Sequence, residues 1–163
     1  MLMMTPLEVI KLSKVYNNKE AVKNISFKIN KNEIIGILGP NGCGKTTTIG
    51  MILGLLKPTK GRVLINGYEI ENKRVDLLNN LNFISPYIEL PKKLTVKQNL
   101  EVYGRLYDIK NLNSKIEYLT EKLRLNEIIY NITGELSSGQ KNRVSLAKSI
   151  INDPSVLLLD EPT

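Results

Sequence analysis

The sequence of 163 residues has a single cysteine, no histidine and no long apolar run. Cys43 cannot form an internal disulfide, and one thiol fits a reducing compartment. No stretch approaches the roughly 20 apolar residues that a helix needs to cross a bilayer. Residues 1–6 lack the basic start and the length of a signal peptide. We therefore expect a cytoplasmic protein that reaches a membrane only through a partner.

The chain also lacks the usual signs of nucleic-acid binding. Its formal net charge is +7, but the lysines are scattered and no aromatic residues interleave a basic stripe. Internal repeats and low-complexity linkers are absent as well. We interpret the excess charge as a solvated surface and expect no direct contact with nucleic acid. A hydrophobic content of 42% is enough for a single domain with its own core.

A phosphate-binding loop is present. Residues 39–46 read Gly-Pro-Asn-Gly-Cys-Gly-Lys-Thr, the G-x-x-x-x-G-K-[ST] pattern, which needs a strand before it and a helix after it. Residues 34–38 form an apolar run typical of a buried parallel strand, and residues 46–55 have helical apolar spacing. This context disfavours an ordinary glycine turn. The predicted nucleotide-binding residues of the loop are Gly39, Pro40, Asn41, Gly42, Cys43, Gly44, Lys45, Thr46 and Thr47.

The chemistry of phosphate transfer explains these residue types. Glycines allow the backbone N–H groups to surround an anion, and the helix N-terminus adds its dipole. Lys45 would reach the β and γ phosphates, while Thr46 and Asp160, which follows an apolar strand, would bind Mg²⁺. Glu161 comes next, and its carboxylate would orient the attacking water, so we predict it as the catalytic residue.

Residues 136–140 read Leu-Ser-Ser-Gly-Gln. With the phosphate loop and the closing Leu-Leu-Leu-Asp-Glu, this segment resembles the ATP-binding subunits of ABC transporters, whose signature is usually L-S-G-G-Q. Ser138 replaces the first glycine. The resemblance covers nearly the whole chain and implies ATP and Mg²⁺ as cofactors. It also implies that a second subunit's ATP is contacted in trans by Ser137, Ser138, Gly139 and Gln140.

Two further positions follow from the resemblance. Tyr16 falls where the family has the aromatic residue that stacks on adenine. Pro86 falls where the family has a glutamine that contacts Mg²⁺ and the membrane subunit. Either Ser85 or a water would fill the metal site, or coupling to the membrane subunit is tuned differently here, so no residue is assigned to that role. Gln98 belongs to the following helix and is expected to face solvent.

The resemblance implies an α/β fold of the P-loop NTPase class. We expect a central, mainly parallel sheet, an N-terminal antiparallel β subdomain and a helical subdomain. The chain, 1–163, would be one ABC-type ATP-binding domain with a β subdomain and phosphate loop (1–80), a helical insertion (81–135), and the signature helix with the last strand (136–163).

Local patterns support several elements independently. The Asn66-Gly67 pair predicts a tight hairpin turn. Residues 95–107 have amphipathic spacing, and Ser114 with Glu117 reads as a capping box that opens another helix. Ser137 or Ser138 can cap the signature helix, whose buried stripe would include Val144, Ala147, Ile150 and Ile151.

Family members continue beyond the position of Thr163 with a dimer-crossing segment, a further core strand and a histidine that contacts the γ-phosphate. We therefore expect an incomplete C-terminal core in this chain, and weak Mg-ATP binding with little hydrolysis. An unpaired apolar sheet edge would favour aggregation.

The resemblance implies ATP binding and hydrolysis that power transport of an unknown substrate. The expected partners are a second ATP-binding subunit and a transmembrane permease, which would place the chain peripherally on the inner face of the membrane. One alternative is a soluble ABC-type ATPase acting on ribosomes or nucleic acid, although such proteins usually have two cassettes. Another is a different P-loop enzyme, but Asn18-Lys19-Glu20 is no guanine-reading motif.

Overall fold

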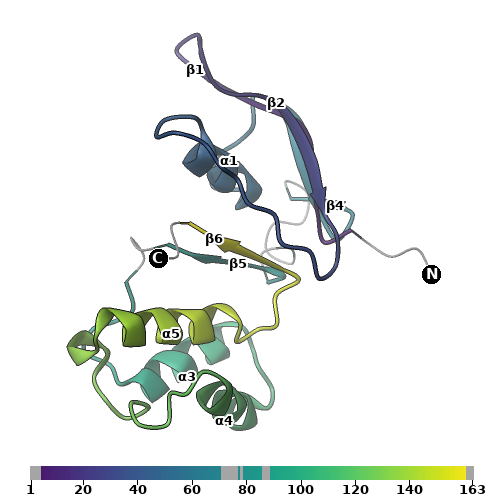
Figure 1. Ribbon diagram of the computed structural model, residues 1–163. Coiled ribbons are helices and arrows are strands. Elements are labelled where there is room, and N and C mark those ends of the chain that lie inside the picture. Colours follow the sequence, from purple (N-terminus) through teal and green to yellow (C-terminus); the bar gives the residue numbers. More distant parts are fainter. Residues whose placement is uncertain (1–4, 71–76, 78, 86–88, 161–163) are drawn as a thin grey trace. The chain divides into compact units, whose positions relative to one another are not determined.

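The computed structural model describes residues 5–70, 77, 79–85 and 89–160. Figure 1 shows their helices and strands in the order of the chain. The chain divides into two compact units, residues 1–81 and 82–163. None of the helices in these described ranges combines the length and the hydrophobicity that a membrane span requires.

A four-stranded antiparallel sheet dominates the first unit. Its strands are β1 (Leu7–Tyr16), β2 (Lys19–Ile29), β3 (Lys60–Ile65) and β4 (Tyr68–Glu69), in the order β2-β1-β3-β4. Asn66 and Gly67 both have positive φ, 49° and 80°, as a two-residue hairpin turn requires. The turn predicted at this pair is confirmed. Asn17 and Asn18, with φ of 45° and 64°, make the same kind of turn between β1 and β2.

Helix α1 (Lys45–Ile52) follows the phosphate loop and ends earlier than its apolar spacing predicts. Gly54 has a φ of 64°, and the amides of Leu55 and Leu56 both donate to the Gly50 carbonyl at 2.9 and 3.0 Å. A left-handed residue with such bonds terminates a helix. The core of this unit combines β1, α1 and β3 through Leu7, Val9, Leu12, Met51, Ile52, Val63 and Ile65, all at most 2% exposed.

The strand expected at residues 34–38 is not formed in this structure. The segment lies outside the assigned strands, and Ile34 and Leu38 are 98% and 93% exposed. A parallel strand exists only when neighbouring strands pair with its backbone, and no strand of the described ranges pairs with this one. An apolar run alone therefore does not determine a strand.

Helices dominate the second unit. They are α3 (Val96–Leu106), α4 (Leu112–Lys122), the short 3₁₀ helix η1 (Thr133–Glu135) and α5 (Ser138–Ser149), and strands β5 (Leu81–Ile84) and β6 (Val156–Leu159) pair in a small sheet. A single cluster of buried residues includes Val96, Leu100, Ile116, Leu119, Leu125, Val144, Ala147 and Ile151.

Two helices of this unit, α3 and α4, were predicted from the sequence. The helix predicted at 95–107 is confirmed as α3, which Thr95 caps. The capping box predicted at Ser114 is wrong, because α4 begins at Leu112 and Ser114 lies inside it. The first residue of α4, Leu112, packs so closely over Gly104 that a Cβ there would overlap it.

Strand β6 forms where the sequence predicts it, but it is less buried than expected. Only Val156 is fully buried, and Leu159 is 47% exposed. Asp160 follows directly, and its backbone amide donates to the Ile84 carbonyl at 2.9 Å. The main-chain position of Asp160 is therefore fixed by β5.

Candidate functional site

The phosphate loop closes tightly before α1. The Cys43 amide donates to the Pro40 carbonyl at 3.2 Å, and Gly44 caps the helix with a φ of 95°. A Cβ on Gly44 would lie 2.3 Å from the Ala21 carbonyl oxygen of β2. Only glycine fits there, both for its φ and for this close approach. The start of α1 is thus held against β2.

Lys45 lies at the first position of α1 and folds back over the loop. Its Nζ donates to the carbonyl oxygens of Gly39 and Pro40 at 2.6 and 3.0 Å. Both acceptors are neutral, so a phosphate oxygen would form the stronger, charge-assisted bond with the same ammonium. The Lys45 ammonium therefore lies over the phosphate loop.

The first turn of α1 is suited to an anion. The Thr48 amide donates to the Gly44 carbonyl at 2.8 Å and makes the first hydrogen bond of the helix. No acidic residue lies in the first turn. The amides before Thr48 point out of the helix N-terminus, where the helix dipole favours negative charge. Thr46 is exposed there.

Tyr16, the predicted adenine-stacking residue, is the last residue of β1 and belongs to the same unit as the loop. Its side chain is 43% exposed. A half-exposed ring at a strand end has surface available for stacking with a planar base.

The predicted Mg²⁺ ligands have the right chemistry. Thr46 offers a hydroxyl and Asp160 a carboxylate, and Mg²⁺ prefers one or two such oxygens together with phosphates and waters. Among the described residues, no cluster of three or more His, Cys, Asp or Glu forms a metal site of its own. Oxygen donors of this kind suit Mg²⁺ that also binds phosphate oxygens, and Thr46 belongs to the first unit and Asp160 to the second. Glu161 and Pro86 lie outside the described residues.

The signature segment opens α5 through a complete capping box. The Gln140 amide donates to Ser137 Oγ at 3.3 Å, and the Ser137 amide donates to Gln140 Oε1 at 2.8 Å. Ser137, Ser138 and Gly139 are exposed, and a Cβ built on Gly139 would meet no atom within 4 Å apart from its chain neighbours and the backbone of its own helix. The helix N-terminus is thus open to a ligand, while the Gln140 side chain is used in the cap.

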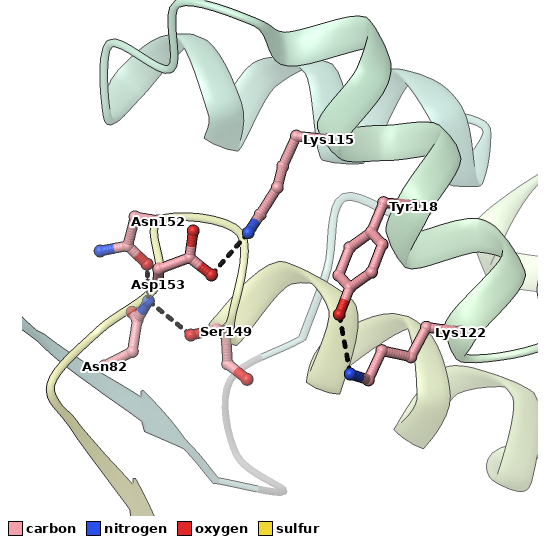
Figure 2. Close-up of polar contacts among 7 residues, drawn as sticks. All are labelled: Asn82, Lys115, Tyr118, Lys122, Ser149, Asn152 and Asp153. Carbon is pink, nitrogen blue, oxygen red and sulfur yellow. Dashed lines mark hydrogen bonds and ion pairs between the residues drawn. The ribbon is translucent and has the colours of Figure 1, made fainter.

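The other end of α5 depends on Asn82 of β5, which the sequence analysis missed. Figure 2 shows Asn82 directed at the turn after α5, where its Nδ2 donates to the Ser149 carbonyl at 2.7 Å and to Asn152 Oδ1 at 2.6 Å. The Tyr107 hydroxyl donates to Asn82 Oδ1 at 3.0 Å. Burial raises the pKa of Tyr107, and this hydrogen bond opposes the rise.

Two lysines add further contacts to this end of α5. Lys115 of α4 forms an ion pair with Asp153 at 2.5 Å (Figure 2). Lys148 places its Nζ 4.8 Å from the centre of the Tyr103 ring of α3, and burial lowers its pKa. The signature helix is therefore anchored to three neighbouring elements at its C-terminal end.

A family model described as "ABC transporter" matches residues 22–163. The chain belongs to the ABC transporter family. Relatives in this family include a probable multidrug ABC transporter ATP-binding protein, YbhF, of Escherichia coli, 36% identical over 161 residues that make up 98% of this chain and 28% of that protein. The Nod factor export ATP-binding protein I of Rhizobium johnstonii is 38% identical over 160 residues, 96% of this chain and 51% of that protein.

The solved structures of this family show the fold. A structure titled "ATP binding subunit of ABC transporter" has a TM-score of 0.87 and 27% identity over 97% of this chain and 67% of that one. CbiO1 of Clostridium perfringens, described as part of the ABC transporter complex cbiONQ, has a TM-score of 0.85 and 30% identity, covering 98% and 66%. The expected P-loop NTPase fold of an ABC ATP-binding domain is confirmed.

Proposed function

We propose that residues 1–163 form an ABC-type ATP-binding domain that binds ATP at residues 39–47 and hydrolyses it to power transport across a membrane. The observation that carries this proposal is the phosphate loop. Gly44 begins α1 against β2 and Lys45 lies over the loop carbonyls, within a region that matches the family.

In this proposal each site residue has a separate role at the nucleotide. Lys45 and the amides at the start of α1 bind the phosphates, and Tyr16 stacks on the base. Thr46 and Asp160 bind Mg²⁺, which neutralises phosphate charge. Glu161 accepts the proton of the attacking water.

The signature segment acts on the nucleotide of a second ATP-binding subunit. Ser137, Ser138 and Gly139 present an open helix N-terminus, whose dipole favours the negative charge of a γ-phosphate. Gln140 acts there by capping α5 and fixing the position of Ser137. Two such chains would complete both sites of a dimer.

A transmembrane permease is the other partner in this proposal. Relatives that are 36% and 38% identical are named for multidrug transport and Nod factor export. The chain spans about half or less of the length of these two proteins. Their names favour a transporter-associated role. In this proposal the permease holds the chain at the inner face of the membrane.

The test separates binding from chemistry in the full-length protein. Glu161→Gln should keep ATP binding in calorimetry and lose turnover by about 10²- to 10⁴-fold, because the amide cannot take the proton of the water. Glu127→Gln removes an exposed carboxylate elsewhere and serves as the matched control. Undiminished phosphate release by Glu161→Gln would refute its role.

A further inference from the structure

A lysine covers one face of the Tyr16 ring. Lys14 Nζ lies 5.0 Å from the ring centre, within the distance of a cation–π contact. The same ammonium donates to the Lys57 carbonyl oxygen at 2.7 Å. Lys14 is thus tied to the aromatic ring and to the backbone that follows α1.

The end of β1 is joined to the same segment by two more hydrogen bonds. The Val15 amide donates to Thr59 Oγ1 at 3.1 Å, and the Thr59 amide donates to the Ser13 carbonyl at 2.9 Å. Residues 57–59 therefore form a strap between β1 and the chain that leaves α1. Because α1 starts at the phosphate loop, the strap fixes the end of β1 relative to that loop within one unit.

The ammonium has a specific consequence for the ring. An aromatic ring has two faces, and the cation on one of them restricts the ring plane and leaves the opposite face for another planar group. A ring that is already ordered loses less conformational entropy when a base stacks on it. A mobile Tyr16 side chain would have to be ordered by the ligand itself.

We propose that Lys14 is a positioning residue for the adenine ring of ATP, acting through Tyr16. The proposal rests on the proposed function, in which Tyr16 stacks on the base and residues 39–47 bind the phosphates. It assigns to Lys14 no contact with the nucleotide. Its effect must therefore depend on the Tyr16 ring and on the presence of a base in the ligand.

The experiment compares two ligands by calorimetry, ATP and inorganic triphosphate. Lys14→Met keeps the aliphatic stem but removes the charge, and should weaken ATP binding about two- to five-fold. Triphosphate affinity should not change. Lys14→Arg should restore ATP binding, because a guanidinium also stacks on an aromatic face. Lys23→Met on β2, whose lysine is exposed, is the control for net charge.

A double variant tests whether Lys14 acts on ATP binding through the Tyr16 ring. In a Tyr16→Leu background, Lys14→Met should cause no further loss of ATP affinity. An equal loss in that background, an equal loss for triphosphate, or no loss of ATP affinity at all would overturn the inference. Failure of the unaltered protein to bind either ligand would instead refute the proposed function, and an unaltered ATP affinity in Tyr16→Leu would refute the role of Tyr16.

Discussion

At the scale of single residues, Cys43 provides a direct probe of the phosphate loop. The thiol is exposed, and its Sγ lies 3.9 Å from Lys45 Nζ. ATP at about ten times its dissociation constant should slow labelling by a maleimide roughly tenfold, because only about one site in ten remains free. Inorganic triphosphate should protect as well, and adenosine should not. Unchanged labelling at saturating ATP would contradict the placement of the phosphates.

Replacing the Asn82 side chain should lower the free energy of unfolding of the second unit. Asn82→Leu removes both donors to the turn after α5 and leaves buried polar partners unsatisfied, at a cost of about 1 to 3 kcal/mol in the free energy of unfolding. Urea denaturation followed by circular dichroism measures it. The exposed Asn126→Leu is the matched control, and equal stabilities of the two variants would contradict the role of Asn82.

Sequence patterns single out some residues as candidates and miss others for a physical reason. Lys45, Thr46 and Ser137 belong to contiguous patterns, in which neighbours in sequence supply the geometry. Asn82 has partners 67 and 70 residues away, and its position within an apolar strand gave no sign of which groups it would meet. Contacts of that kind depend on tertiary packing.

At the scale of elements, the N-terminal caps of α3 and α5 can be compared directly, because both are of the same kind. Thr95 and Ser137 both make full capping boxes. Thr95→Ala and Ser137→Ala should each lower the free energy of unfolding by about 1 kcal/mol. Only Ser137→Ala should also lower ATP turnover, because in our proposal that cap faces the nucleotide of a second subunit. Equal turnover in both variants would contradict the trans assignment.

Element boundaries show where sequence patterns are sufficient. The start of helix α5 and the turn at Asn66 formed as predicted, because a cap or a turn is determined by a few adjacent residues. The stripe predicted for α5 was partly wrong, since the helix ends at Ser149 and Ile150 and Ile151 follow it. The segment 34–38 did not form a strand, since a parallel strand depends on partners elsewhere in the chain. The start of α4 was missed because its N-cap residue, Asn111, makes no side-chain cap hydrogen bond, while the capping pattern at Ser114 lies inside the helix.

At the scale of the whole molecule, three short motifs were enough to predict the ABC fold. The phosphate loop, the signature segment and the Asp160 strand occur in a fixed order, and few folds combine them. In our proposal these motifs contact only the nucleotide, so they carry no information about a substrate.

The central claim is that residues 39–47 bind ATP. Calorimetric titration of Mg-ATP into the unaltered protein and Lys45→Ala tests it most directly, with Lys31→Ala as a control for the loss of an exposed charge. Removing a charge-assisted contact of about 1.5 to 3 kcal/mol should weaken binding roughly 10- to 150-fold. The control should bind as the unaltered protein does. Equal ATP affinity in Lys45→Ala and the unaltered protein would contradict the account.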